Sequence, residues 1–197
     1  VSKTAVRTLW FAIMVIVLDQ LSKYWAVSTL TFGEPMAVIP NLNWTLTYNH
    51  GAAFSFLADM GGWQRWFFTG LAAAVSAILY VWLKKLPNRL NIETIGINLV
   101  LGGAIGNVID RVRLGYVVDF IDVHFGGWHY PAFNVADSAI TCGVILLLVL
   151  VKFAEPVLLE QTTEELEAII QSLEEEIEEI RGETRIVNKE LVSRKEQ

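Results

Sequence analysis

Residues 134–153, NVADSAITCGVILLLVLVKF, decide the fold of this chain, because the stretch is long and apolar enough to cross a lipid bilayer as a helix. Three other stretches meet the same requirement, at about residues 9–27, 63–83 and 95–114. The chain has 197 residues, of which 53% are hydrophobic, and its mean hydropathy is +0.44. This composition is typical of a small multi-pass membrane protein, so we expect an all-α membrane protein with four transmembrane helices.

The arrangement of Lys and Arg predicts how these spans are oriented. Basic residues precede the first span, fill the connection between the second and third, and end the fourth; they are Lys3, Arg7, Lys84, Lys85, Arg89 and Lys152. The other two connections, residues 28–62 and 115–133, contain no Lys or Arg. Cytoplasmic loops are enriched in basic residues, so we expect both termini in the cytoplasm and these two connections on the periplasmic face. Asp19 and Lys23 interrupt the first span, which indicates a retained helix rather than a cleaved signal peptide.

The first periplasmic connection has a structure of its own. In residues 42–48, LNWTLTY, large apolar residues alternate with small polar ones, which is the period of a half-buried strand. We therefore expect a small periplasmic β-sheet on the membrane surface. The segment from Asn49 to Trp63 follows, and its apolar residues could lie along the interface as a lid over a site or as a plain anchor.

Two aspartates stand where apolar segments meet water: Asp119, in VVDF at 117–120, and Asp137, near the start of the fourth span. A carboxylate is costly at such a boundary, so the pair is a candidate functional site. The short loop between them can fold back and bring the two carboxylates together. Two close carboxylates share one proton, so one can act as the base toward a water molecule and the other as the acid, which is a mechanism for amide hydrolysis.

Asp137 also has a structural explanation. Asn134 can cap the fourth helix, and an acid three residues later lies in the first helical turn, where the helix dipole favours negative charge. Capping explains nothing about Asp119, which we expect in the loop. The sequence therefore leaves both a functional and a capping role open for Asp137.

The third span ends in a second polar group. Residues 102–106, GGAIG, place small side chains four apart, so that a neighbouring helix can approach closely. Asn107, Asp110 and Arg111 follow at the outer end of the same helix. They could support a site, although Asp110 and Arg111 could also simply neutralise each other or pair with nearby polar groups.

Other kinds of site are poorly supported. The sequence has no HExxH motif, no cysteine cluster, and no nucleophilic serine with a partner histidine, which leaves hydrolysis by the carboxylate pair. His124 and His129 lie near Asp122, but we expect them to face water, and we expect no metal and no cofactor. Cys142, the one cysteine, is expected to be inert packing. No basic groove with interleaved aromatic residues suggests nucleic acid.

The last part of the chain differs in composition. Residues 1–154 hold 10 basic and 8 acidic residues, whereas residues 155–197 hold 5 and 13. We expect two domains with this boundary, and the sequence TTEE at 162–165 predicts a new cytoplasmic helix that begins with a capping box. A heptad pattern follows, with Ile170 and Ile177 at a and with Leu166, Leu173 and Ile180 at d, and it continues to Thr184, Val187 and Leu191.

This heptad pattern permits self-association. In a parallel dimer, Glu176 at g could pair with Arg181 at e, although Thr184 and Gly182 weaken the seam and the helix. The alternative is a solvated helix that extends into the cytoplasm.

A series of motifs in this chain resembles, in order and spacing, the boxes of bacterial lipoprotein signal peptidase, also called signal peptidase II. They are DQLSK at 19–23, NHGAAF at 49–54, GGAIGNVIDR at 102–111, VVDF at 117–120 and FNVAD at 133–137. The resemblance covers about residues 5–153, and the tail departs from it, because members of this family generally end soon after the fourth span.

The resemblance implies an aspartyl endopeptidase of the bacterial inner membrane. Such an enzyme removes the signal peptide from a diacylglyceryl-modified prolipoprotein, cutting just before the lipidated cysteine. By resemblance, Asp119 and Asp137 are the catalytic pair. The remaining matched positions imply supporting roles: Asn107, Asp110, Arg111 and Asn134 for positioning substrate or the acids, and Asp19, Lys23, Asn49 and Gly51 for organising the site and its outer loop.

The resemblance also implies partners. These are the lipidated prolipoprotein, membrane lipids, and globomycin-type inhibitors that would occupy the same cleft. Two rival hypotheses remain at this point: a non-catalytic membrane scaffold whose charges pair structurally or relay protons, and a binding module built around the charged tail.

Overall fold

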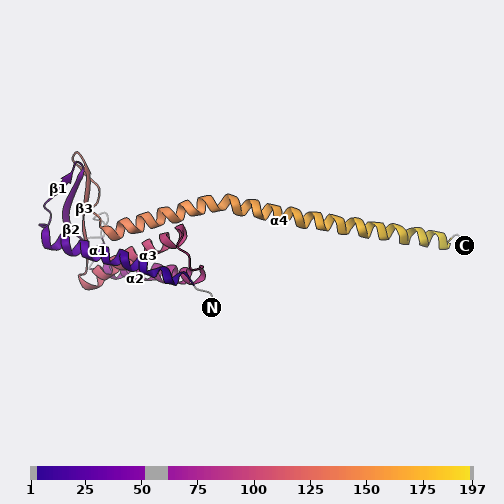
Figure 1. The fold of residues 1–197 in the computed structure, drawn as a ribbon, viewed down its shortest axis with the longest axis horizontal. Coiled ribbons are helices and arrows are strands. Elements are labelled where there is room, and N and C mark those ends of the chain that lie inside the picture. Colours follow the sequence, from indigo (N-terminus) through magenta and orange to yellow (C-terminus); the bar gives the residue numbers. More distant parts are fainter. Residues whose placement is uncertain (1–3, 52–61, 196–197) are drawn as a thin grey trace. The chain divides into compact units, whose positions relative to one another are not determined.

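The computed structural model describes residues 4–51 and 62–195 and divides the chain into two compact units, Val1–Leu150 and Val151–Gln197 (Figure 1). The chain forms a short 3-10 turn and four long helices: η1 (Ala5–Thr8), α1 (Leu9–Thr29), α2 (Trp63–Lys85), α3 (Ile92–Arg113) and α4 (Val135–Lys195). Four helical stretches are long and apolar enough to cross a membrane: Ala5–Thr29, Trp63–Lys85, Ile92–Arg113 and Val135–Lys152. They lie within a few residues of the four spans that the sequence predicts.

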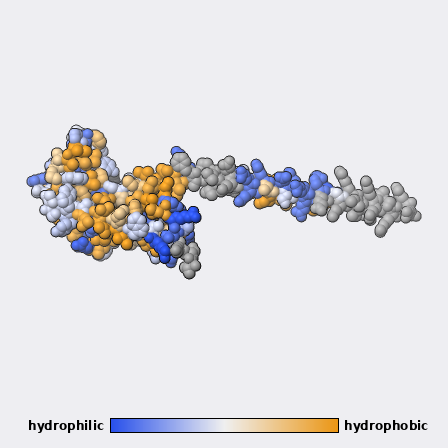
Figure 2. Space-filling model, viewed as in Figure 1, coloured by the Kyte–Doolittle hydropathy of each residue, from blue (hydrophilic) through white to orange (hydrophobic). Residues whose placement is uncertain are grey.

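The first unit has an apolar surface, which is visible as the orange areas of Figure 2. Leu21 of α1, Ile78 of α2 and Leu148 of α4 are between 61% and 65% exposed. Soluble proteins rarely leave such broad apolar areas uncovered, whereas a bilayer covers them with acyl chains. The exposed side chains are therefore those expected to face lipid.

Helix α3 is the central helix of this unit, because 61% of its most apolar stretch is buried inside the protein. A capping box starts it: Asn91 Oδ1 accepts from the Thr94 backbone N–H at 2.9 Å, and Thr94 Oγ1 accepts from the Asn91 backbone N–H at 3.0 Å. Satisfying these backbone donors at the helix end matters in an apolar setting, where an unpaired polar group is costly.

The glycines of α3 allow close packing, as their spacing predicts. A Cβ atom at Gly102 would meet the backbone of α1, and one at Gly103 would overlap the carbonyl oxygen of Ala136 in α4. A Cβ atom at Gly106 would lie 2.6 Å from Asp19 Oδ2. The missing side chains thus let α1 and α4 approach α3 on either side, and they leave room for the Asp19 carboxylate.

A small antiparallel sheet completes the first unit. Its strands, in spatial order, are β1 (Met36–Ile39), β2 (Leu42–Asn49), β3 (Val117–Phe125) and β4 (Trp128–His129). Strand β2 confirms the strand predicted at residues 42–48. Strand β3 is a correction, because Asp119 was expected in a loop and instead pairs with Thr47 in the middle of the sheet. The first four residues of β3 are all buried, so the sequence there lacks the alternation of apolar and polar residues that predicts a half-exposed strand.

The sheet packs on the outer end of α1. Leu46 of β2 and Phe120 of β3 form a buried cluster with Ala26 and Leu30 of α1. The indole of Trp25 adds an edge-to-face contact with Phe120, with ring centres 6.1 Å apart. This packing anchors the strand that carries Asp119 to the helix that carries Asp19 and Lys23.

In the second unit, the chain stays helical to Lys195. The prediction of a new helix starting at residue 162 is therefore wrong: α4 runs through the TTEE motif without interruption. The two glutamates are good helix formers, and a capping motif acts as a cap only where the chain before it leaves the helix.

The apolar stripe of the second unit is uncovered. The side chains at its predicted a and d positions are 49–55% exposed: Leu166, Ile170, Leu173, Ile177 and Ile180. The side chains of Thr184, Val187 and Leu191 lie outside those described, as do residues 52–61 of the predicted lid segment.

Candidate active site

Asn134 and Asp137 form a reciprocal cap at the start of α4. Asn134 Oδ1 accepts from the Asp137 backbone N–H at 2.9 Å, and Asp137 Oδ2 accepts from the Asn134 backbone N–H at 3.3 Å. This is the capping role that the sequence predicts for Asn134. The cap holds the Asp137 carboxyl group at the first turn of α4, near the positive end of the helix dipole.

Asp119 lies on β3 beside this helix start and is only 2% exposed. Its Oδ1 accepts a hydrogen bond from Asn134 Nδ2 at 2.7 Å, and Asn49 also hydrogen-bonds to its carboxyl group. Asn134 therefore contacts both aspartates, with its side chain on Asp119 and its backbone on Asp137.

Asn107 of α3 makes the second link between the two acids. Its Nδ2 donates to Asp137 Oδ1 at 2.7 Å, while its Oδ1 accepts from Asn134 Nδ2 at 3.2 Å. Lys23 Nζ donates to the Asn107 Oδ1 at 2.9 Å. Helices α1, α3 and α4 and strand β3 thus meet in one network of hydrogen bonds that contains both carboxyl groups.

Lys23 also joins two buried carboxylates. Its Nζ lies 2.9 Å from Asp19 Oδ2 and 2.9 Å from Asp110 Oδ2. Of the two structural alternatives for Asp110, pairing with Arg111 or with other nearby polar groups, the second is observed, since Asp110 pairs with Lys23 of another helix. Gln20 Nε2 bridges the same two carboxylates, at 3.1 Å from Asp19 Oδ2 and 3.0 Å from Asp110 Oδ1.

Each of these two carboxylates also binds the backbone next to a member of the aspartate pair. Asp19 Oδ1 accepts from the Ala136 backbone N–H at 2.9 Å, directly before Asp137. Asp110 Oδ2 accepts from the Val118 backbone N–H at 3.2 Å, directly before Asp119. The ion cluster therefore fixes the backbone from which each acid projects.

Asn49 and Gly51 shape the end of β2. The Gly51 N–H donates to Asn49 Oδ1 at 2.9 Å, and Gly51 has a φ of +96°, a conformation that favours glycine. A Cβ atom at Gly51 would also lie 2.9 Å from the Phe68 ring of α2. The guanidinium of Arg111 lies over the same ring, 5.6 Å from its centre.

The site raises the pKa of one aspartate. Burial raises the pKa of Asp119 from 3.8 to about 7, and the negative charge of Asp137 adds to the rise. Hydrogen bonds from Asn49 and Asn134 and the positive charge of Lys23 act in the opposite direction. Asp119 therefore keeps its proton to much higher pH than an ordinary aspartate.

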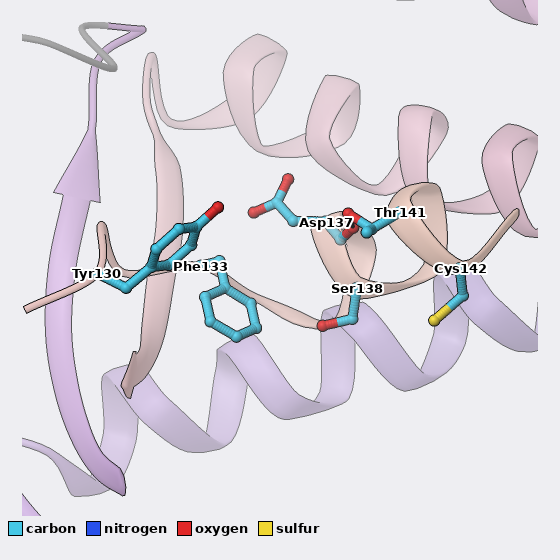
Figure 3. Close-up of a pocket in the computed structure, with 6 residues that line it drawn as sticks. All are labelled: Tyr130, Phe133, Asp137, Ser138, Thr141 and Cys142. Carbon is cyan, nitrogen blue, oxygen red and sulfur yellow. Dashed lines mark hydrogen bonds between the residues drawn. The ribbon is translucent and has the colours of Figure 1, made fainter. Parts of the chain in front are cut away.

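A cavity of about 310 Å³ adjoins Asp137 (Figure 3). Five further side chains line it: Tyr130, Phe133, Ser138, Thr141 and Cys142. Cys142 was expected to be inert packing inside the fourth span, but it is exposed. The sequence does not distinguish the lipid-facing side of an all-apolar span from its buried side, so this exposure could not be predicted.

Sequence reasoning also passed over Gln20. The sequence could have marked Gln20 as a site residue, because an amide side chain beside Asp19 within an apolar span is costly unless it forms hydrogen bonds. Its two bonds to the ion cluster give the reason for its presence.

The histidines expected to face water lie on β3 and β4. His129 Nδ1 is 2.8 Å from Asp122 Oδ1, and the imidazole of His124 stacks on that of His129. Asp122 itself is buried rather than solvated and also accepts from Thr45 Oγ1 at 2.9 Å. Within residues 4–51 and 62–195, no three His, Cys, Asp or Glu side chains are grouped to hold a metal ion.

The chain resembles a well-populated set of membrane enzymes. The family described as signal peptidase (SPase) II matches residues 11–153. A lipoprotein signal peptidase of Hydrogenovibrio crunogenus is 58% identical over 148 residues, which is 75% of this chain and 86% of that protein. Those of Acinetobacter baumannii and Coxiella burnetii are 54% and 51% identical, each over 75% of this chain, and over 84% and 91% of their own lengths.

A solved structure has the same fold. A bacterial membrane enzyme determined by the in meso method at 1.9 Å resolution superposes with a TM-score of 0.66 and 37% sequence identity, covering 76% of this chain and 96% of that one. A second such structure, at 2.3 Å resolution, gives a TM-score of 0.65 with the same identity. Together with the four apolar helices, these matches make the chain a multi-pass membrane protein that belongs to the signal peptidase II family.

Proposed function

We propose that this protein is an aspartyl endopeptidase that removes the signal peptide from diacylglyceryl-modified prolipoproteins, cutting just before the lipidated cysteine. The observation that carries the proposal is the double contact of Asn134, whose side chain donates to Asp119 and whose backbone donates to Asp137. The relatives named lipoprotein signal peptidase support the same activity.

Asp137 acts as the base and Asp119 as the acid. Asp137 takes a proton from a water molecule as the water oxygen attacks the scissile carbonyl carbon. Asp119, which keeps its proton up to about pH 7 because burial raises its pKa, donates a hydrogen bond to the developing oxyanion and then its proton to the leaving amine. The C–N bond breaks, and proton exchange with solvent restores the starting state of the pair.

The supporting residues position these two acids. Asn107 and Asn134 orient the carboxyl groups through their amides, while Asp19, Lys23 and Asp110 hold the two backbone segments. Three further residues act at the rim: Asn49 with Gly51 shapes the outer loop, and Arg111 supplies positive charge near both acids.

The site faces the periplasm in a bacterial inner membrane, and both termini are cytoplasmic. This orientation rests on the basic residues of the opposite connections and on the exposed indoles of Trp63 and Trp66 at the start of α2 and of Trp128 on β4. A lipidated cysteine keeps its acyl chains in the bilayer, so its scissile bond lies near that surface. Globomycin-type inhibitors bind in the same cleft.

Residues 1–154 form the peptidase domain, and residues 155–197 form a separate cytoplasmic tail. The tail associates with a second copy of itself as a parallel coiled coil, which would cover the exposed stripe. Glu176 of one copy would then face Arg181 of the other, while within one chain Arg181 lies 2.8 Å from Glu178. Sedimentation in detergent tests this, because identical monomers for the full chain and for residues 1–154 would rule it out.

The activity is tested with purified protein and a diacylglyceryl-modified prolipoprotein, with the products identified by mass. We expect a signal peptide ending directly before the lipidated cysteine, and no product from Asp119→Asn or Asp137→Asn. Glu34→Gln is the matched control, since Glu34 is an exposed acid of the first outer connection. If the intact chain is folded but cleaves nothing, the non-catalytic membrane scaffold is the better hypothesis. If cleavage requires the tail, the binding module built around the charged tail is favoured.

A further inference from the structure

A second cavity, of about 170 Å³, lies between α1 and α3 at the ends of these helices that adjoin the sheet. Side chains of both helices line it, and the start of β3 closes it at Val118. None of the described residues that line this cavity also lines the cavity beside Asp137. It is therefore a separate feature of the first unit, which the proposed cleavage reaction does not use.

The floor of this cavity is the buried ion cluster. Lys23 and Asp110, whose side chains are each 4% exposed, line it together with Gln20. The three donor positions of the Lys23 ammonium are taken by Asp19, Asp110 and Asn107. One ammonium against the two carboxylates of Asp19 and Asp110 leaves the cluster with one negative charge in excess. The floor therefore attracts a cation and repels an anion.

The rim of the cavity carries a positive charge that lacks an acidic partner. Arg113, in the last turn of α3, is exposed, and none of the ion pairs between described residues includes it. Tyr24 of α1 adds a phenol hydroxyl to the same cavity and is 75% exposed. A guanidinium binds a phosphate group through two parallel N–H bonds, and a phenol hydroxyl can donate another. The rim thus suits a phosphate.

Apolar side chains lead from this rim along the lipid-facing side of α1. Leu21 and Val17 lie three and seven residues before Tyr24, on the same face of the helix, and they are 61% and 48% exposed. Leu114, directly after Arg113, is 45% exposed. A molecule whose phosphate is held at the rim can therefore lay acyl chains along this surface.

We propose that this cavity binds the headgroup of a zwitterionic phospholipid, with its phosphate on Arg113 and Tyr24 and its ammonium group toward the floor. The two charges of such a headgroup match the rim and the floor in sign, whereas a headgroup with a net negative charge is repelled by the floor. A volume of about 170 Å³ holds roughly six groups the size of a water molecule at ~30 Å³ each. That space suits the headgroup, while the acyl chains stay outside on α1.

Native mass spectrometry of the purified full chain in detergent tests this proposal. The probes are phosphatidylethanolamine and phosphatidylglycerol with identical acyl chains. We expect one ethanolamine lipid to bind with a lower Kd than the glycerol lipid. Arg113→Gln should raise that Kd roughly 10- to 100-fold, which corresponds to the loss of hydrogen bonds to a charged group. Arg89→Gln removes an exposed arginine from the connection between α2 and α3 and should bind as the wild type does.

Three results would overturn the proposal. The first is a Kd for phosphatidylglycerol equal to or lower than that for phosphatidylethanolamine, because the floor then makes no selection. The second is an unchanged Kd in Arg113→Gln. The third is equally tight binding of glycerophosphoethanolamine, the same headgroup without acyl chains, which would identify the ligand as a soluble phosphate ester instead of a membrane lipid.

Thermal unfolding provides a second measurement and a check on folding. In lipid-free detergent, Arg113→Gln should unfold at the wild-type Tm, because the Arg113 side chain is exposed. Phosphatidylethanolamine at ten times its wild-type Kd should raise the Tm of the wild type and of Arg89→Gln, and raise that of Arg113→Gln much less. Equal increases in all three chains would mean that the lipid acts as a general solvent, which also overturns the proposal.

The site does not depend on the proposed function. These measurements follow binding and stability rather than cleavage, so a chain that cleaves no prolipoprotein could still bind the lipid. Conversely, loss of the lipid site would leave the evidence for the peptidase unchanged.

Discussion

The Asp19 carboxylate binds the backbone N–H of Ala136 at 2.9 Å, so a residue in the first span holds the residue directly before Asp137. Asp110 makes the matching contact before Asp119, and Lys23 lies between the two carboxylates at 2.9 Å from each. One buried cation thus governs the placement of both members of the pair. The buried charge cluster and the aspartate pair are therefore parts of one arrangement.

Replacing Lys23 should disrupt this arrangement. Lys23→Met leaves two buried carboxylates without their cation, which should destabilise the fold by about 3–5 kcal/mol and greatly reduce kcat. Thermal unfolding and cleavage rate provide the measurements. Lys85→Met, at the exposed end of α2, should match the wild type, and an unaltered Tm for Lys23→Met would contradict the positioning role.

In the proposed mechanism Asp119 donates a proton, so cleavage should decline as the pH rises above about 7 and Asp119 loses this proton. The same raised pKa affects stability. Its folded value of about 7 exceeds its ordinary value of 3.8, so the folded chain binds more protons and stability falls as the pH rises between these values.

The Asp119→Asn variant should therefore lack this part of the pH dependence. Its Tm relative to the wild type should increase between pH 5 and pH 8, although the variant is inactive throughout. The Glu34→Gln chain should follow the wild-type curve. If Tm depends on pH in the same way for Asp119→Asn and the wild type, then burial does not raise the pKa of the Asp119 carboxyl group.

Asn134 should separate capping from catalysis. Asn134→Ser keeps a good N-cap residue but shortens the side chain that reaches Asp119, so Tm should change little. Because the active form of Asp119 is neutral, losing this hydrogen bond costs about 0.5–1.5 kcal/mol, so kcat should fall roughly 2- to 12-fold. Because that bond lowers the Asp119 pKa, its loss should move the alkaline limb of the activity profile to higher pH.

Asn134→Ala supplies the comparison, since it removes the cap as well and should lower both Tm and activity. An active Asn134→Ser chain with an unshifted pH profile would exclude a role for this amide in orienting Asp119.

Gly103 should not tolerate a side chain. Gly103→Ala places a methyl group on the Ala136 carbonyl oxygen, which forces α3 and α4 apart and should destabilise the chain by about 1–3 kcal/mol. Gly70→Ala in α2 meets nothing within 4 Å and should stabilise slightly, by up to about 1 kcal/mol. Similar Tm values for the two variants would argue against close packing at Gly103.

Asp122 should stabilise the hairpin of β3 and β4. Burial alone would raise its pKa, but hydrogen bonds from His129, Thr45 and Asn43 outweigh this and leave the pKa below its usual value. Its contribution is therefore present at neutral pH and lost as the pH falls through that lowered pKa.

Hydrogen exchange at neutral pH tests the contribution of Asp122. Asp122→Asn should speed exchange of the Tyr130 amide, which donates to the Val123 carbonyl oxygen at 2.8 Å. The Leu101 amide in α3 should be unaffected, and equal exchange at Tyr130 in both chains would contradict the stabilising role.

Local sequence determined the four spans, the strand at residues 42–48 and the Asn134 cap, because hydropathy, alternation and capping chemistry act over a few neighbouring residues. It also marked Asp119 and Asp137 as unusual, since a carboxylate at the edge of an apolar segment is costly wherever the chain later places it. The same local information misjudged the start of the tail helix, where a capping motif lies in a helix interior.

Only the tertiary structure decided which polar groups meet. Asp19 and Ala136 are 117 residues apart in sequence, and Lys23 and Asn107 are 84 apart, so no local pattern could pair them. The strand conformation at Asp119 and the exposure of Cys142 likewise depend on which segments pack against β3 and α4. Burial among these distant segments is also what raises the Asp119 pKa. The raised pKa therefore depends on the tertiary structure and could not be predicted from any local stretch of sequence.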